Sequence, residues 1–261
     1  MTPQEAQRLG DELYAALRSR STVAPITERV ADVTIDDAYR ISQRMLERRL
    51  SDGEKVVGKK IGVTSKAVQS MLDVHQPDFG FLTDAMMFDD GAAIPIGSLL
   101  IQPRAEGEIA FLLAHDLAGP GITEADVLSA TRCVRPCFEI VDSRVRDWKI
   151  RIEDTVADNA SSGVFVLGAD EVDPKTVDLL GCRIVVTKNA AKLSEGVGAA
   201  ALGSPAYAVA WLANTMSSFG APLRAGEVIL SGSLVPLEPV RAGDRMSLVI
   251  DGIGRASVSF V

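Results

Sequence analysis

Two glutamates separated by a single residue are the sharpest chemical feature of the sequence. Glu106 and Glu108 lie in the segment RAEGEIAFLL, whose composition is typical of a β-strand. Alternation along a strand puts both carboxylates on one face, while Ile109 and Phe111 point to the other. Adjacent carboxylates repel each other unless a cation neutralises them, and Mg²⁺ or Mn²⁺ prefers such oxygen ligands. The alternative is a solvated polar strand edge, which needs no cation.

A third glutamate stands alone inside an apolar segment. Glu139 follows Cys137 and Phe138 and precedes Ile140 and Val141. A buried carboxylate is rarely left without a partner. Glu139 either forms a salt bridge with Arg144 or another arginine, or joins Glu106 and Glu108 around one metal ion. The second explanation accounts for all three acids together, so we predict a metal site with three glutamate ligands.

Two further segments carry side chains that could move protons. Lys59 and Lys60 are neighbours in a predicted strand, so one of them must point toward the interior or a cleft. An inward lysine near a metal can have a lowered pKa and transfer protons; the alternative is an edge-strand lysine that discourages aggregation. Asp78, in a predicted loop between Pro77 and Phe79, is a candidate general acid or base, or else a turn-forming aspartate.

Small polar residues gather in two other places. The segment 154–163, DTVADNASSG, contains Asn159 and Ser161, whose amide and hydroxyl could bind a carboxylate or enolate oxygen of a substrate. Ser233 follows an apolar strand in a similar but weaker position. The alternative in both places is an ordinary loop with bonds between side chains and backbone.

Composition restricts the kind of protein that carries these groups. The chain has 261 residues, 47% of them hydrophobic, which is enough for a sizeable core. A net charge of −8 without a basic stripe argues against nucleic-acid binding. No apolar run approaches the ~18–20 residues of a membrane span, and the acidic, helix-like segment 1–13 does not resemble a signal peptide. Three cysteines and two histidines favour buried thiols over a zinc site or disulfides, so we expect a cytoplasmic protein.

The elements that must position these residues fall into two blocks. Apolar spacing over 3–19, and again from a capping box at Thr34 and Asp37 to a stop before Gly53, predicts two amphipathic helices. From Lys55 onward short β-like segments dominate. We predict strands near 55–63, 105–113, 134–142, 163–167, 182–187, 227–232, 245–250 and 255–260, and helices after Ser65, after Thr123 and from Ser204 to Phe219. This pattern predicts an α+β fold, with an N-terminal helical cap over 1–54 and a β-rich catalytic domain over 55–261.

Taken in order, the same segments resemble the 2-keto-4-pentenoate hydratase/4-oxalocrotonate decarboxylase family of the fumarylacetoacetate hydrolase superfamily. The resemblance covers essentially the whole chain and is carried by GKKIGVTSKAVQ (58–69), HQPDFGFLTDAM (75–86), IQPRAEGEIAFLL (101–113), FEIVDSR (138–144), DTVADNASSG (154–163), ALGSPAYAVAWLAN (201–214) and GEVILSGSLVPLEPV (226–240). It implies a mixed β-sandwich or roll that holds Mg²⁺ or Mn²⁺, in a homo-oligomer often built on pentamers. By position, Glu106, Glu108 and Glu139 match metal ligands, Lys60 and Asp78 match proton-handling residues, and Ser161 matches a hydroxyl that holds the substrate carboxylate.

The resemblance also implies a reaction. The family contains hydratases and decarboxylases, and both Asp78 after Pro77 and the segment 146–150 resemble the hydratases. We therefore expect addition of water to 2-hydroxypenta-2,4-dienoate, giving 4-hydroxy-2-oxopentanoate in meta-cleavage degradation of aromatic compounds. The alternatives are a metal-dependent 4-oxalocrotonate (2-oxo-3-hexenedioate) decarboxylase and a scaffold subunit of a hydratase–decarboxylase complex. An acylpyruvate hydrolase is disfavoured, because His75 and His115 do not match the histidine pattern of those relatives.

Overall fold

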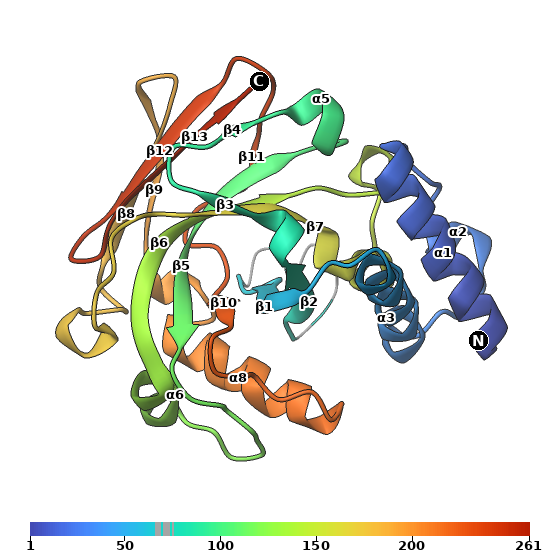
Figure 1. Ribbon diagram of the computed structural model, residues 1–261, viewed down its shortest axis with the longest axis horizontal. Helices are drawn as coiled ribbons and strands as arrows, with labels where there is room; N and C mark the ends of the chain where they lie inside the picture. Colours follow the sequence, from blue (N-terminus) through green and yellow to red (C-terminus); the bar gives the residue numbers. More distant parts are fainter. Residues whose placement is uncertain (66–68, 70–73, 75) are drawn as a thin grey trace.

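The computed structural model describes residues 1–65, 69, 74 and 76–261, and it combines helices with two β-sheets (Figure 1). The helix predicted after Ser65 and the side chain of His75 lie outside the described residues.

The N-terminal block is helical, as predicted. Its helices are α1 (Pro3–Ser19), α2 (Ile26–Arg29) and α3 (Ile35–Ser51). The predicted capping box is present, because the Thr34 side chain accepts from the Asp37 N–H while the Asp37 side chain accepts from the Thr34 N–H. The two long helices pack side by side on one flank of the β-structure (Figure 1). Their apolar faces form a cluster that also includes Ile152 and Val156, so this small core extends beyond the predicted cap.

A large mixed sheet carries most of the candidate site. Its order is β2-β1-β10-β5-β6-β7-β3, with β11 added beside β5. The strands are β1 (Val56–Gly62), β2 (Asp78–Thr83), β3 (Met87–Asp89), β5 (Arg104–Leu113), β6 (Thr131–Val141), β7 (Ser162–Leu167), β10 (Val228–Leu230) and β11 (Glu238–Pro239). The β1–β10 and β3–β7 pairs are parallel and the other pairs are antiparallel.

A second sheet closes the sandwich on one face of the first. Its order is β4-β13-β12-β8-β9, formed by β4 (Ala93–Ile94), β8 (Arg183–Lys188), β9 (Ala191–Val197), β12 (Arg245–Ile250) and β13 (Gly254–Phe260). Ile109 and Phe111 of the large sheet share one apolar core with Ile184 and Leu248 of the second. This core covers the face of β5 opposite to the two glutamates, as the alternation of its sequence predicts.

Short helices connect and cover the strands. They are the α-helices α5 (Ile96–Leu99), α6 (Glu124–Ala130), α7 (Ile152–Ala157) and α8 (Pro205–Ser218), and the 3₁₀ turns η1 (Asp84–Met86), η2 (Arg146–Trp148), η3 (Asn159–Ser161), η4 (Pro174–Thr176) and η5 (Gly198–Ala200). The helix predicted from Ser204 is confirmed, with Ser204 as its N-cap and Pro205 in its first turn. Across the described part of the chain, no helix has both the length and the apolar character that crossing a membrane requires.

The predicted α+β class with an N-terminal helical segment is confirmed. The strands β2, β3, β4, β9 and β11 were not predicted, and most of them are short or polar. The boundary between 54 and 55 remains a prediction.

Candidate metal centre and active site

The three predicted glutamates meet on neighbouring strands. The register of β5 and β6 places Glu106 directly opposite Glu139, and Glu108 two residues further along β5 on the same face. One carboxylate oxygen from each lies within 4.8 Å of the others, and all three side chains are buried. The solvated-edge alternative is therefore wrong, because β5 and β6 are interior strands. The Arg144 alternative is also wrong, because that guanidinium binds Asp158.

These carboxylates carry more negative charge than the described residues neutralise. Glu108 Oε2 accepts from the Gly232 N–H at 2.8 Å. Glu108 Oε1 and Glu139 Oε2 are buried without a hydrogen-bond partner among the described residues, and Glu139 Oε1 has an ion pair with Lys60. Burial, reinforced by the charge of Glu139, raises the pKa of Glu106 to about 8. The same two causes raise the pKa of Glu108 above its ordinary value. An all-oxygen donor set with unpartnered anionic atoms fits a divalent cation such as Mg²⁺ or Mn²⁺.

Lys60 projects from β1 into the same cluster. Its Nζ lies 3.2 Å from Glu139 Oε1 and donates to the Ala160 carbonyl at 3.0 Å. Burial alone would lower the pKa of Lys60, but attraction from Glu139 and then Asp78 outweighs burial and raises it. The pKa of Lys60 is therefore raised among these carboxylates without a cation, whereas the lowered pKa was expected for a lysine beside a bound metal and stays a prediction. The edge-strand alternative is wrong, because β1 lies between β2 and β10.

Asp78 shares a wall of the site with Lys60. It is the first residue of β2, opposite Gly62 of β1, so the predicted loop position is wrong. A Cβ at position 62 would lie 2.2 Å from Asp78 Oδ1 and 3.2 Å from Lys60 Nζ, so only glycine leaves room for both groups. Burial raises the pKa of Asp78 although Lys60 opposes it, and both carboxylate oxygens are buried without a hydrogen-bond partner among the described residues.

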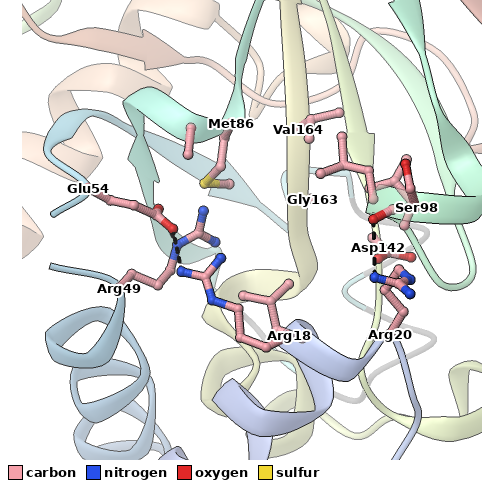
Figure 2. Close-up of a pocket in the computed structure, with 13 residues that line it drawn as sticks. Arg18, Arg20, Arg49, Glu54, Met86, Ser98, Asp142, Gly163 and Val164 are labelled. Carbon is pink, nitrogen blue, oxygen red and sulfur yellow. Dashed lines mark hydrogen bonds and ion pairs between the residues drawn. The ribbon is translucent and has the colours of Figure 1, made fainter. Parts of the chain in front are cut away.

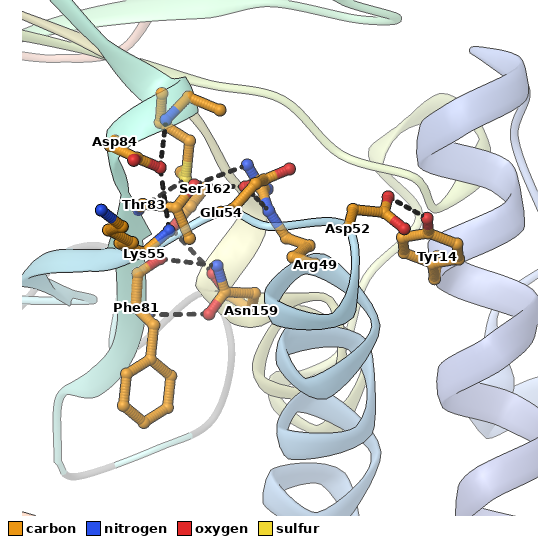
Figure 3. Close-up of polar contacts among 12 residues, drawn as sticks. Tyr14, Arg49, Asp52, Glu54, Lys55, Phe81, Thr83, Asp84, Asn159 and Ser162 are labelled. Atoms are coloured by element: carbon orange, nitrogen blue, oxygen red, sulfur yellow. Dashed lines mark hydrogen bonds and ion pairs between the residues drawn. The ribbon is translucent and has the colours of Figure 1, made fainter.

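The predicted substrate-binding side chains have different surroundings. The Ser161 hydroxyl is buried, 3.1 Å from Thr155 Oγ1, in the turn η3 whose Ala160 carbonyl meets Lys60. Ser233 donates to the Val235 carbonyl at 2.5 Å and contacts Glu106. Asn159 differs from both, because its amide oxygen and nitrogen are already bonded to the backbone of Phe81 (Figure 3).

Two contributors to the site escaped the sequence prediction. The Ala160 carbonyl and the Gly232 N–H are backbone groups, and every residue type has such groups, so the amino-acid type does not indicate their role. The sequence signals that could have found them are the glycine in Ser231-Gly232-Ser233 and the run of small residues in 154–163.

A separate cavity lies away from the carboxylates. It has a volume of about 150 Å³, and Arg18, Arg20, Arg49 and Glu54 are among its lining residues (Figure 2). Arg18 and Arg49 both bind Glu54, and Arg20 reaches the Ser98 carbonyl at 3.4 Å (Figure 2). None of its lining residues belongs to the carboxylate cluster or contacts Lys60, so this cavity is not part of the candidate site.

Comparison with known proteins identifies the family of the chain. Residues 55–261 match the family model described as fumarylacetoacetate (FAA) hydrolase C-terminal. A 2-hydroxyhexa-2,4-dienoate hydratase from Comamonas testosteroni is 60% identical over 252 residues, covering 96% of this chain and 96% of that protein. A 2-hydroxypent-2,4-dienoate hydratase from Pseudomonas putida is 66% identical over 212 residues, covering 81% and 96%.

A solved structure extends the comparison to three dimensions. The 4-oxalocrotonate decarboxylase from Pseudomonas putida G7, complexed with magnesium and adipate, superposes with a TM-score of 0.97. It is 33% identical, and the match covers 100% of this chain and 99% of the decarboxylase. The chain therefore belongs to the fumarylacetoacetate hydrolase family, as a close relative of its 2-hydroxydienoate hydratases.

Proposed function

We propose that the protein is a metal-dependent hydro-lyase that adds water to 2-hydroxypenta-2,4-dienoate and gives 4-hydroxy-2-oxopentanoate. The observation that carries the proposal is the convergence of Glu106, Glu108 and Glu139 beside Lys60. This arrangement occurs in a chain that is 60% and 66% identical to two dienoate hydratases. It combines a place for a cation with a group that transfers protons.

Three glutamates are the proposed ligands. Glu106, Glu108 and Glu139 would hold Mg²⁺ or Mn²⁺, because their buried carboxylate oxygens lie close together and those of Glu108 and Glu139 are not all hydrogen-bonded within the described residues, which suits a hard cation. When bound, such an ion supplies Lewis-acid stabilisation of negative charge on a 2-oxo acid, which is worth several kcal/mol in a transition state. A relative of the same fold was solved with magnesium, which supports the assignment.

Lys60 and Asp78 are the proposed proton-transfer groups. The reaction needs a proton taken from the C2 hydroxyl and one delivered to C5 of the dienol, and then a proton taken from the water that attacks C4 and one delivered to C3. Lys60 and Asp78 lie on one wall over Gly62, so a substrate held there meets both. Proton transfer by one positioned group typically contributes ~10²–10⁴-fold to the rate. The Ser161 hydroxyl is the proposed partner of the substrate carboxylate, and Ser233 is a second candidate that also orients Glu106.

Exchange in D₂O separates the roles of Lys60 and Asp78. If Asp78 activates the attacking water, Asp78→Asn should block hydration while the substrate still takes up deuterium at C5. If Asp78 instead delivers the C5 proton, the variant should lose both processes. An unaffected hydration rate in Asp78→Asn removes Asp78 from the mechanism.

A direct assay tests the proposed reaction. The dienol should disappear spectrophotometrically in the presence of Mg²⁺ or Mn²⁺, and EDTA should stop the loss. The product should be 4-hydroxy-2-oxopentanoate, identified by mass spectrometry. Turnover that EDTA does not affect contradicts the metal role.

Decarboxylation is the second candidate, because a solved decarboxylase shares the fold over the whole chain. The same stabilised enolate would serve loss of CO₂ from 2-oxo-3-hexenedioate. Parallel measurement of CO₂ decides between the two reactions: release faster than hydration makes the chain a decarboxylase. A chain without either activity would fit a scaffold subunit.

The setting of the enzyme is proposed from the family resemblance described in the sequence analysis. We propose a cytoplasmic homo-oligomer built on pentamers that works in meta-cleavage degradation of aromatic compounds, with a 4-oxalocrotonate decarboxylase as a candidate partner. Light scattering of the purified chain, alone and with such a decarboxylase, tests both parts of the assembly.

A further inference from the structure

The turn η3 has an unusual backbone. Its residues Asn159, Ala160 and Ser161 have φ values of 55°, 51° and 51°, in the left-handed region. Asparagine tolerates this region well, but alanine and serine adopt it rarely. Three consecutive residues in this conformation persist only where surrounding contacts hold them, and such strain is concentrated at functional sites.

Buried contacts hold both ends of η3. The Arg144 guanidinium is fully buried; it donates to the carbonyls of Asp158 and Ser162, which flank the turn, and pairs with the Asp158 carboxylate. The Ser162 hydroxyl donates to the Asn159 carbonyl at 2.8 Å. These contacts hold the turn against β6 and β7 but do not attach it to the strand that carries Asp78.

The Asn159 side chain supplies that attachment. Its Oδ1 accepts from the Phe81 N–H at 2.8 Å, and its Nδ2 donates to the Phe81 carbonyl at 2.9 Å (Figure 3). Because β2 is the last strand of the sheet, the amide pairs with β2 at Phe81 as a further strand would. Close approach is possible because residue 80 is glycine: a Cβ there would lie 2.5 Å from the Asn159 carbonyl oxygen.

Pairing of β1 with β2 sets the backbones of Lys60 and Asp78, and the Asn159 attachment sets the carbonyl that holds the Lys60 ammonium. Asp78 lies three residues before Phe81 on β2, and the Ala160 carbonyl next to Asn159 accepts from Lys60 Nζ at 3.0 Å. Resting on the function proposed above, we infer that Asn159 is a positioning residue, not a substrate ligand. Its amide joins η3 to β2 and so places the Ala160 carbonyl that holds the Lys60 ammonium beside Asp78.

The chain offers a matched control for this inference. Asn189, in the turn between β8 and β9, has a φ of 54° and also makes two side-chain hydrogen bonds. Its partners are Asp244 and Arg245, around the second sheet. Substitution of either asparagine by glycine keeps the left-handed backbone accessible and removes two hydrogen bonds, so Asn159→Gly and Asn189→Gly differ in location.

Three measurements on both variants test the inference. Hydrogen exchange of the Phe81 amide should be faster in Asn159→Gly and unchanged in Asn189→Gly. Titration with MgCl₂ should give affinities within about threefold of the wild type in both, because the glutamates lie on β5 and β6. In Asn159→Gly, kcat for dienol hydration should fall roughly 10- to 100-fold while KM changes little, since small misplacements of reacting groups have effects of this size.

A milder variant covers the case in which Asn159→Gly does not fold. Asn159→Asp retains an acceptor for the Phe81 N–H and should recover part of kcat. Unchanged Phe81 exchange, unchanged kcat, or an equal loss of kcat in Asn189→Gly overturns the inference. Failure of the proposed function is distinguishable, because the wild type would then not hydrate the dienol at all, whereas exchange at Phe81 reports the contact without substrate.

Discussion

Two adjacent lysines of β1 have opposite electrostatic surroundings. Lys59 and Lys60 are both buried, and they point to opposite faces of the strand. Lys59 Nζ contacts both oxygens of one carboxylate, Glu227, at 2.5 and 2.6 Å. Lys60 instead lies among Glu139, Asp78 and the two other glutamates, where several oxygens have no hydrogen-bond partner among the described residues.

The difference distinguishes a lysine whose charge has one matched partner from a lysine that we propose acts in the reaction. Lys59 and Glu227 form a closed pair that satisfies both partners, as Arg144 and Asp158 do deeper in the fold. The cluster around Lys60 contains more acidic groups than basic ones and is left incomplete. Buried ions in a stable protein are normally paired, so an unbalanced buried cluster indicates a place for a ligand.

The largest effect on activity should follow from Lys60→Met. Removal of the ammonium group takes away a proposed proton-transfer group, so the rate of hydration should fall roughly 10²–10⁴-fold. Steady-state kinetics at saturating Mg²⁺ measures the loss. The control is Lys59→Met, the same substitution one residue earlier. The molecules of this variant that are folded should have the kcat of the wild type. An equal loss of kcat in both variants would contradict the difference in role between the two lysines.

The largest effect on stability should follow from Lys59→Met. The substitution leaves the Glu227 carboxylate without its partner, which typically costs roughly 3–5 kcal/mol for a buried pair. Urea unfolding with circular dichroism measures the change. The double substitution Lys59→Met/Glu227→Leu should restore much of the stability, because it removes both charges. A variant as stable as the wild type would mean that the closed pair is not structural.

A further effect should appear in the pH dependence of the metal-free protein. Burial and the nearby Glu139 raise the folded-state pKa of Glu106 from 4.5 to about 8. Its contribution to stability is therefore fully present below pH 4.5 and is lost as the pH rises toward 8, by at most about 1.4 kcal/mol per pH unit for one proton. Wild type should lose stability relative to Glu106→Gln over this window in EDTA. A difference that is constant with pH would contradict the account.

The sequence predicted those parts of the site that follow from the residue pattern within a single strand. Alternation along β5 placed Glu106 and Glu108 on one face, and the lone acid in an apolar segment singled out Glu139. The capped helices α1, α3 and α8 were also predictable, because their start and stop signals are local.

What the sequence could not supply depends on distant partners. Asp78 was assigned to a loop because Pro77-Asp78 is typical of a turn, yet pairing with β1 makes it the start of a strand. The bonds from Asn159 to Phe81 span 78 residues, and those from Lys59 to Glu227 span 168. Strands such as β4 and β11 are two residues long, and only their pairing with neighbouring strands makes them part of a sheet.

Metal binding by the purified chain tests the account most directly. Calorimetric titration with MnCl₂ after EDTA treatment should show one ion per chain, held by Glu106, Glu108 and Glu139. In Glu106→Gln the affinity should fall by more than about 100-fold, since even residues behind a ligand contribute 10–100-fold, and circular dichroism should show an intact fold. A wild type that binds no ion, or a Glu106→Gln variant with unchanged affinity and full activity, would contradict it.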